Sequence, residues 1–258
     1  LSTEKQLLVI YPYLGAAEGM FRCKNKMTNI LTRFINIEGV AFQWIVQSGR
    51  WKLLRLSSLP GTNFVMKRDI LDTIGGWDEK ALTEDSELSV RIYQAGKRIK
   101  FVPYSVSWEQ EPPRLDTWFR QRTRWVRGNN YVLWKFLKEI FRFKSKAMAV
   151  EMLYNLSLYY IFFFAVIFSD VIFLLGLADI WHITLLGPFS EVWLMGYILF
   201  ILEVFLGLSL QKEDSLLNFV FVIVSYFTYC QCWLFVVFVA IWQDFIGAAQ
   251  VWQKTERF

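Results

Sequence analysis

Histidine is nearly absent from this sequence, because His182 is the only one among its 258 residues. That scarcity excludes, within the chain, a histidine-dependent catalytic triad and a metal site built from several histidines. Cysteine is scarce too: Cys23, Cys230 and Cys232 are the three present, and the last two stand two positions apart in an apolar run. Residues two apart on a helix do not face each other. The cysteines are therefore interpreted as small buried apolar residues rather than as metal ligands.

Charge becomes scarce after about residue 147. Hydrophobic residues make up 55% of the sequence, whereas soluble domains usually hold about 45–50%, and the excess lies in this second part. Three runs, at about 152–177, 192–210 and 216–243, are each long and apolar enough to cross a membrane. We therefore predict a polar domain over residues 1–147, followed over 148–258 by an all-α transmembrane part and a short tail.

Acidic residues are few between 114 and 146, where ten lysines and arginines stand against Asp116 and Glu139 alone. A basic run beside a membrane span favours the cytoplasmic side, so we predict a multi-pass protein of the plasma membrane with its polar domain in the cytoplasm. The run suits contact with the lipid bilayer or with a phosphate-bearing substrate. Nucleic acid is not expected as a partner, because no nucleic-acid-binding motif accompanies the run. The side of the C-terminus stays open: three spans place it outside, while Lys254 and Arg257 favour the inside.

The polar domain alternates strand-like and helix-like segments, which is an α/β pattern. Apolar residues at helical spacing predict one long helix, and glycines close two shorter ones. The last segment, 115–141, is amphipathic and is expected to lie at the membrane surface. We expect strands at 13–19, 51–56, 61–68 and 98–104, and helices at 28–47, 68–79, 84–97 and 115–141.

Thr83, Glu84 and Asp85 stand directly before the helix-like run "SELSVRIYQ". A threonine can cap a helix and acidic residues complement its dipole, so the triplet by itself favours a capping role. Other segments change that reading. Gly61, in "GTNFVMKR", allows close backbone approach to a ligand. The segment "QRTRW", residues 121–125, brings arginines that can pair with phosphate and a tryptophan face that can carry a sugar ring.

Taken in order, "GTNFVMKRDILDTIGGWDEKALTED" and "QRTRW" resemble the membrane-bound family 2 glycosyltransferases, among them the bacterial synthases of cellulose, hyaluronan and poly-N-acetylglucosamine. The resemblance runs from about residue 14 to 128 and more loosely into the apolar runs, and the tail "WQKTER" is similar to that of some members. It implies the C-terminal part of a GT-A nucleotide-diphospho-sugar transferase domain followed by transmembrane helices. It also implies that Asp85 is the catalytic base, with Thr83 and Glu84 beside it. Under the same resemblance the nucleotide diphosphate and the acceptor sugar are held by Gln121, Arg122, Arg124 and Trp125, and the acceptor side is lined by Gly61 and Thr62.

The chemistry of these residues agrees with that resemblance. A positioned carboxylate can take the proton of a sugar hydroxyl as it attacks, and fixed cations can stabilise the departing nucleoside diphosphate. The expected function is inverting transfer of a sugar from a nucleotide sugar, a UDP-sugar, to a growing polysaccharide of the cell envelope. Two alternatives stay open: non-processive transfer of one sugar to a lipid carrier, and a non-enzymatic membrane protein.

One part of the family pattern is missing from this sequence. Members carry a D-x-D motif for Mg²⁺ or Mn²⁺ upstream of the strand at 13–19, but residues 1–13 contain no aspartate. We therefore expect the donor- and metal-binding half to lie upstream of this chain, and we do not expect the chain to be active alone.

Overall fold

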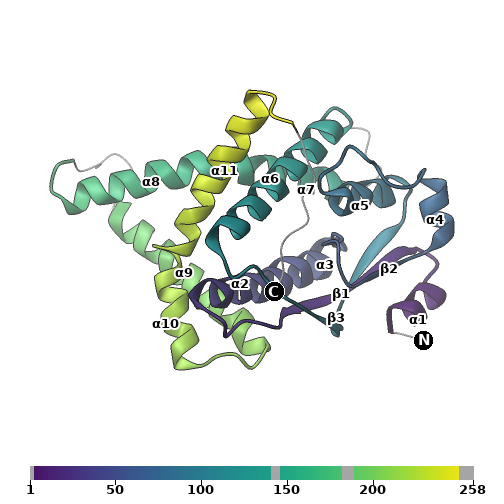
Figure 1. Cartoon of the computed structure of the whole chain (residues 1–258), viewed down its shortest axis with the longest axis horizontal. Helices are drawn as coiled ribbons and strands as arrows, with labels where there is room; N and C mark the ends of the chain where they lie inside the picture. Colours follow the sequence, from purple (N-terminus) through teal and green to yellow (C-terminus); the bar gives the residue numbers. More distant parts are fainter. Residues whose placement is uncertain (1–2, 141–145, 182–188, 250–258) are drawn as a thin grey trace.

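The computed structural model describes residues 3–140, 146–181 and 189–249, and the predicted tail motif lies outside them. The polar domain contains a three-stranded sheet and the helices around it (Figure 1). Its elements are α1 Thr3–Ile10, β1 Leu14–Cys23, α2 Ile30–Ala41, the π-helix Phe42–Gln47, α3 Ser48–Leu54, β2 Phe64–Met66, α4 Arg68–Thr73, α5 Glu84–Gln94, β3 Arg98–Glu109 and α6 Leu115–Leu137. The apolar part contains α7 Lys146–Leu156, the π-helix Ser157–Ile161, α8 Phe162–Leu177, α9 Phe189–Leu210, α10 Leu216–Ser225 and α11 Tyr229–Phe245.

The sheet has the order β2-β1-β3, with β1 antiparallel to β2 and parallel to β3. The predicted α/β class is therefore confirmed, as a mixed sheet with helices. The register between β1 and β3 shifts after Gly19. A Cβ atom on Gly19 would lie 2.4 Å from the carbonyl oxygen of Ser105, so only glycine fits at this irregular crossing.

The predicted strand at 51–56 is wrong. Residues 48–54 form α3, which continues the helical run of α2 and ends where Arg55 takes a left-handed conformation with φ 56°. A short apolar run cannot distinguish a strand from a helix by its spacing. Here the side chain of Leu53 is 82% exposed and does not face the core, so the run reflects no sheet packing.

The core of the polar domain lies between the sheet, α5 and α6. Leu88, Val90 and Ile92 of α5 are all buried, and they pack in one cluster with Ile99 of β3. The same cluster includes Met148 and Met152 of α7. The first predicted span, 152–177, therefore begins in a helix that packs on the polar domain.

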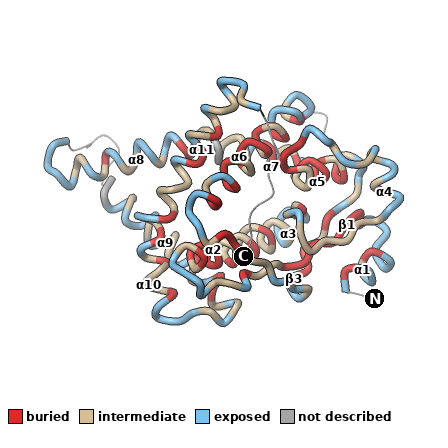
Figure 2. The backbone as a smooth tube through the Cα atoms, in the orientation of Figure 1, coloured by how far each residue is buried: buried red, intermediate tan, exposed pale blue. Residues whose placement is uncertain are grey.

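By length and composition, the residues that the structure describes contain two stretches long and apolar enough to cross a membrane, Glu191–Leu210 and Leu216–Phe245, and a shorter apolar helix at Phe163–Leu177. Many large apolar side chains of α8 and α9 face outward, and Figure 2 shows much of both helices as exposed. Such surface is typical of a segment that contacts lipid or another protein.

Helix α6 is more enclosed than the surface helix predicted for 115–141. It packs against α5 on one side and α11 on the other (Figure 1). The side chain of Trp118 is fully buried, and its ring contacts those of Tyr229 and Trp233 on α11. Helix α6 therefore joins the polar domain to the apolar part.

Candidate active site

The triplet Thr83-Glu84-Asp85 lies at the start of α5, as predicted, but Thr83 does not cap the helix through its side chain. Its carbonyl oxygen accepts a hydrogen bond of 3.1 Å from the amide of Glu87. Its buried hydroxyl has no hydrogen-bond partner within the described part of the chain. The capping interpretation is therefore wrong for the Thr83 hydroxyl.

The carboxylate of Asp85 lies in a largely desolvated position. The pKa of this carboxyl group is raised to about 6, mainly by burial and also by the charge of Glu84, while the hydrogen bond from the Ser86 amide and the charge of Arg124 act in the opposite direction. The Ser86 amide donates to Oδ1 over 2.7 Å. Asp85 is thus mostly ionised at neutral pH yet close to its titration range, which is the condition that suits a general base.

The backbone of Gly61 lies directly over this carboxylate. Gly61 has φ +79°, and a Cβ atom there would lie 2.8 Å from Oδ2 of Asp85. Its neighbour Thr62 is half-buried. The structure therefore brings the predicted acceptor-side residues and the predicted base together.

Asn63 fixes the position of the turn that contains Gly61, and this asparagine was not singled out from the sequence. It takes a left-handed conformation with φ 48°. Its side-chain amide donates to the carbonyl oxygens of Met20 (2.8 Å) and Ser105 (2.9 Å), and its own carbonyl accepts from the amide of Gly19 over 2.7 Å. An asparagine after Gly-Thr and before a strand is the one signal of this turn in the sequence.

Helix α6 places Arg124 beside the triplet. Burial lowers the pKa of Arg124, while the charges of Glu84 and Asp85 act in the opposite direction. Its Nη1 lies 3.5 Å from the carbonyl oxygen of Leu82. One positive group therefore faces the two carboxylates across the start of α5.

Gly128 allows this close approach of α6. A Cβ atom on Gly128 would lie 2.8 Å from the backbone nitrogen of Thr83 and 2.6 Å from its hydroxyl oxygen. Sequence reasoning did not single out this glycine. Its neighbour in "RWVRG", Arg127, instead pairs with Asp244 of α11 over 2.8 Å.

Arg122 points away from the triplet. Its guanidinium is buried, pairs with Glu38 of α2 over 2.9 Å, and lies 4.0 Å from the ring centre of Trp125. Tyr229 of α11 donates to the same Glu38 oxygen over 2.6 Å. Gln121 is also buried on α6. The structure thus brings Arg124 to the carboxylates and groups Arg122 with Trp125, toward α2 and α11.

The part of the chain that the structure describes contains no group of three or more His, Cys, Asp or Glu residues that could hold a metal ion. Glu84 and Asp85 by themselves do not make a complete set of ligands. These residues therefore do not fit a resident Mg²⁺ or Mn²⁺, and no step below depends on one.

Comparison with known proteins shows the family of this chain. Residues 16–244 match the family described as glycosyl transferase family group 2. A probable glycosyltransferase of Bacillus subtilis, YdaM, is 43% identical over 249 residues, covering 95% of this chain and 59% of the relative. The chain thus spans well under two thirds of that relative's length.

Two further similarities are more distant. A poly-β-1,6-N-acetyl-D-glucosamine synthase of Staphylococcus aureus is 30% identical over 122 residues, covering 47% of this chain and 29% of the synthase. A mannosyltransferase of Pyrobaculum calidifontis, solved with GDP-Man and Mn²⁺, is similar with a TM-score of 0.46 and 14% identity, over 85% of this chain and 55% of that one. The family match speaks against the non-enzymatic alternative, because the matched residues make up most of the chain: this chain belongs to glycosyl transferase family group 2.

Proposed function

We propose that the chain carries the catalytic base and the acceptor side of an inverting glycosyltransferase that extends a polysaccharide at the membrane. The observation that carries this proposal is the position of Asp85: an ionisable carboxylate under the backbone of Gly61, with Arg124 beside it. The expected fold of the complete catalytic unit is GT-A, of which this chain forms the C-terminal part. The expected donor is a UDP-sugar, and the staphylococcal relative is named for a polymer of N-acetylglucosamine.

In the proposed reaction an acceptor hydroxyl approaches Asp85 beside the backbone of Gly61. Asp85 takes the hydroxyl proton while the oxygen attacks the anomeric carbon of the donor and the bond to the nucleoside diphosphate breaks. Arg124 stabilises the negative charge that gathers on the departing diphosphate. Thr62 contacts the acceptor. Thr83, Glu84 and Gln121 help to place these groups, and the face of Trp125 supports the acceptor sugar.

A divalent metal, Mg²⁺ or Mn²⁺, would supply further positive charge at the diphosphate. We place its ligands, and most contacts to the donor, outside the residues of this chain. The residues described here then bind the acceptor, hold the base and exclude water.

The two substitutions that test the α6 contacts are Arg124→Ala and Trp125→Ala. We expect Arg124→Ala to lower kcat and Trp125→Ala to raise the KM for acceptor, each by about tenfold, the loss of one to two kcal/mol of interaction. The assay uses membranes with the protein expressed from its complete gene and labelled UDP-N-acetylglucosamine as the first probe. If both variants keep the parental kcat and KM, the segment "QRTRW" has no role in transfer and serves only to anchor the helix.

Product size decides between the proposed polymer and the alternative of single transfer to a lipid carrier. The same labelled donor should yield a long, solvent-insoluble product if transfer is processive. A product that extracts into organic solvent and carries one sugar would favour the lipid-carrier alternative.

The topology proposal follows from polar contacts at the ends of the apolar helices. Glu213, in the turn between α9 and α10, pairs with Lys26 over 2.6 Å and also with Arg22, so this turn lies against the polar domain. The end of α11 does so too, through the pair of Arg127 and Asp244. We therefore propose that α8 and α9 cross the membrane, and that the stretch Leu216–Phe245 begins and ends on the cytoplasmic side with the polar domain.

Cysteine labelling tests this arrangement in a background without the native cysteines. Ile180→Cys, just after α8, should react with a membrane-impermeant maleimide in intact cells, whereas Asp214→Cys should react only after lysis. Thr184, the first choice from the sequence, lies outside the described residues. Labelling of both positions in intact cells, or of neither, would contradict the proposed crossing.

A further inference from the structure

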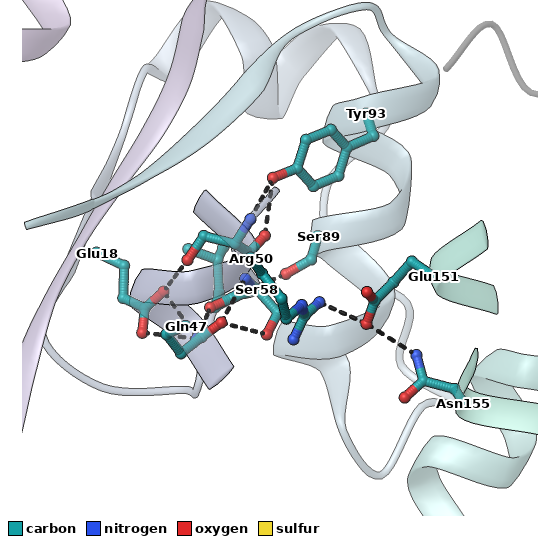
Figure 3. Close-up of polar contacts among 10 residues, drawn as sticks. Glu18, Gln47, Arg50, Ser58, Ser89, Tyr93, Glu151 and Asn155 are labelled. Carbon is teal, nitrogen blue, oxygen red and sulfur yellow. Dashed lines mark hydrogen bonds and ion pairs between the residues drawn. The ribbon is translucent and has the colours of Figure 1, made fainter. Parts of the chain in front are cut away.

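A second carboxyl group lies beneath the proposed site and has no part in the reaction as described. Glu18, in the middle of β1, is fully buried. Its oxygens accept hydrogen bonds from Nε2 of Gln47 at 3.0 and 3.1 Å and from the hydroxyl of Ser57 at 2.8 Å (Figure 3). Burial of a carboxyl group is costly unless it is hydrogen-bonded, so this set of partners indicates a maintained cluster rather than an incidental contact.

The partners of Glu18 also hold the loop that ends at Gly61. Nε2 of Gln47 donates to the carbonyl oxygen of Ser58 over 2.8 Å. The hydroxyl of Tyr93 both accepts from the amide of Ser57 and donates to its carbonyl oxygen, each over 2.8 Å. Residues 57 and 58 of the loop are therefore held by side chains from β1, from the π-helix Phe42–Gln47 and from α5.

Hydrogen bonds also connect this loop to the backbone of Asp85. The amide of Leu59 donates to the hydroxyl of Ser89, which donates to the carbonyl oxygen of Asp85, each over 2.8 Å. Ser57, Leu59 and Gly61 thus form a short path from Glu18 to the point where Gly61 covers the Asp85 carboxylate.

We propose that Glu18 is a positioning residue of the transfer site: through Gln47 and Ser57 its carboxyl group holds the loop of residues 56–63 at the separation from Asp85 that the acceptor requires. This inference rests on the proposed role of Asp85 as the base. Glu18 itself does not touch the substrate.

The charge around Glu18 supports a neutral state. The pKa of Glu18 is raised to about 8, mainly by burial and also by the charge of Asp85. The hydrogen bonds from Ser57 and Gln47 and the charge of Arg50 act in the opposite direction. Arg50 on α3 forms an ion pair with Glu151 of α7, with 2.5 Å between the charged atoms (Figure 3). A protonated carboxyl group can still accept from Gln47, and its own O–H then donates to the Ser57 hydroxyl oxygen in place of accepting from it.

The protonation state of Glu18 makes transfer depend on pH. Since the folded-state pKa lies above the ordinary value of 4.5, the carboxyl keeps its proton at neutral pH and loses it as the pH rises through about 8. The new charge would lie beneath the loop and repel Asp85. Transfer by the parent protein should therefore fall above that pH.

The test compares Glu18→Gln with Glu18→Ala, in the protein expressed from its complete gene. Glu18→Gln keeps the shape and the neutral state, so we expect parental KM and kcat at pH 7 and no loss of transfer above pH about 8. Glu18→Ala removes the support, and we expect the acceptor KM to rise about tenfold, as the loss of one buried hydrogen-bonding group would give, with the donor KM unchanged. Asp72→Asn is the control, because Asp72 belongs to an exposed surface ion pair. It should change neither the KM values nor the pH dependence of transfer.

A second readout does not depend on activity. Amide hydrogen exchange of residues 57–62 should become faster in Glu18→Ala, and also in Ser57→Ala, but not in Glu18→Gln. An unchanged exchange rate in both alanine variants, or an alkaline loss that persists in Glu18→Gln, would overturn the inference. Failure of the proposed function is distinct, because it would appear as transfer surviving in Asp85→Asn whatever the state of the loop.

Discussion

Asp85→Asn is expected to lower sugar transfer by about 10²–10⁴-fold, the usual contribution of general-base catalysis. The amide keeps the shape and can still accept the 2.7 Å hydrogen bond from the Ser86 amide, but it cannot take a proton. Folding should not suffer. The pKa of Asp85 is raised from 3.8 to about 6, so the ionised carboxylate opposes folding above that range, and its removal should leave the melting temperature unchanged or higher.

The measurement is transfer from labelled UDP-N-acetylglucosamine, with donor binding and thermal stability recorded in parallel. Glu84→Gln is the matched comparison, and it should cost less because we assign Glu84 to placement. Asp72→Asn is the control for loss of a surface charge. Substantial transfer by a folded, donor-binding Asp85→Asn protein would mean that the base lies elsewhere and that the triplet serves the start of α5.

The parent enzyme should also show an acidic limit that Asp85 sets. A base must be unprotonated to act, and burial raises the pKa of this carboxyl to about 6. Transfer should therefore fall as the pH drops through about 6. A profile that stays flat down to pH 4.5 would contradict the assigned role, since a base protonated there cannot assist attack.

Gly128→Ala is expected to have the next largest effect, because the added methyl group has no space. Its Cβ would lie 2.8 Å from the backbone nitrogen of Thr83 and 2.5 Å from Cγ2 of the same residue, and a backbone atom cannot rotate away. Helix α6 and the triplet must then separate. We expect a loss of about 1–3 kcal/mol in the free energy of unfolding, as overpacking usually costs. A displacement near 1 Å at the site can lower transfer by about 10²-fold.

Gly49→Ala is the matched control within the same domain. It lies in α3, where an added Cβ meets nothing within 4 Å, so alanine should instead stabilise the helix by roughly 0.5–1 kcal/mol. Thermal unfolding and transfer are measured for both variants. Parental transfer and stability in Gly128→Ala would show that α6 does not depend on this close contact for its position.

The sequence by itself determined the chemical components of the site and their order along the chain. The ordered segments from Gly61 to Asp85 and from Gln121 to Trp125 are local patterns, and the types of residue in them suit the proposed reaction. The α/β class and the inward face of α5 were also readable, because Leu88 and Ile92 recur at helical spacing. The apolar runs followed from composition alone.

The tertiary structure decided which of these components meet. Residues 51–56 were ambiguous by spacing, and only their continuation of a packed helix excluded the predicted strand. Arg122 and Arg124 are two positions apart on one helix, so they point in different directions; packing of α6 between α5 and α11 determines which of them faces Asp85. Asn63, Gly128 and Glu18 carry no motif, because their roles depend on atoms brought from distant segments. Steric fit and burial act between segments that are distant in the sequence. They therefore decide which residues meet at the site, and a local sequence pattern cannot.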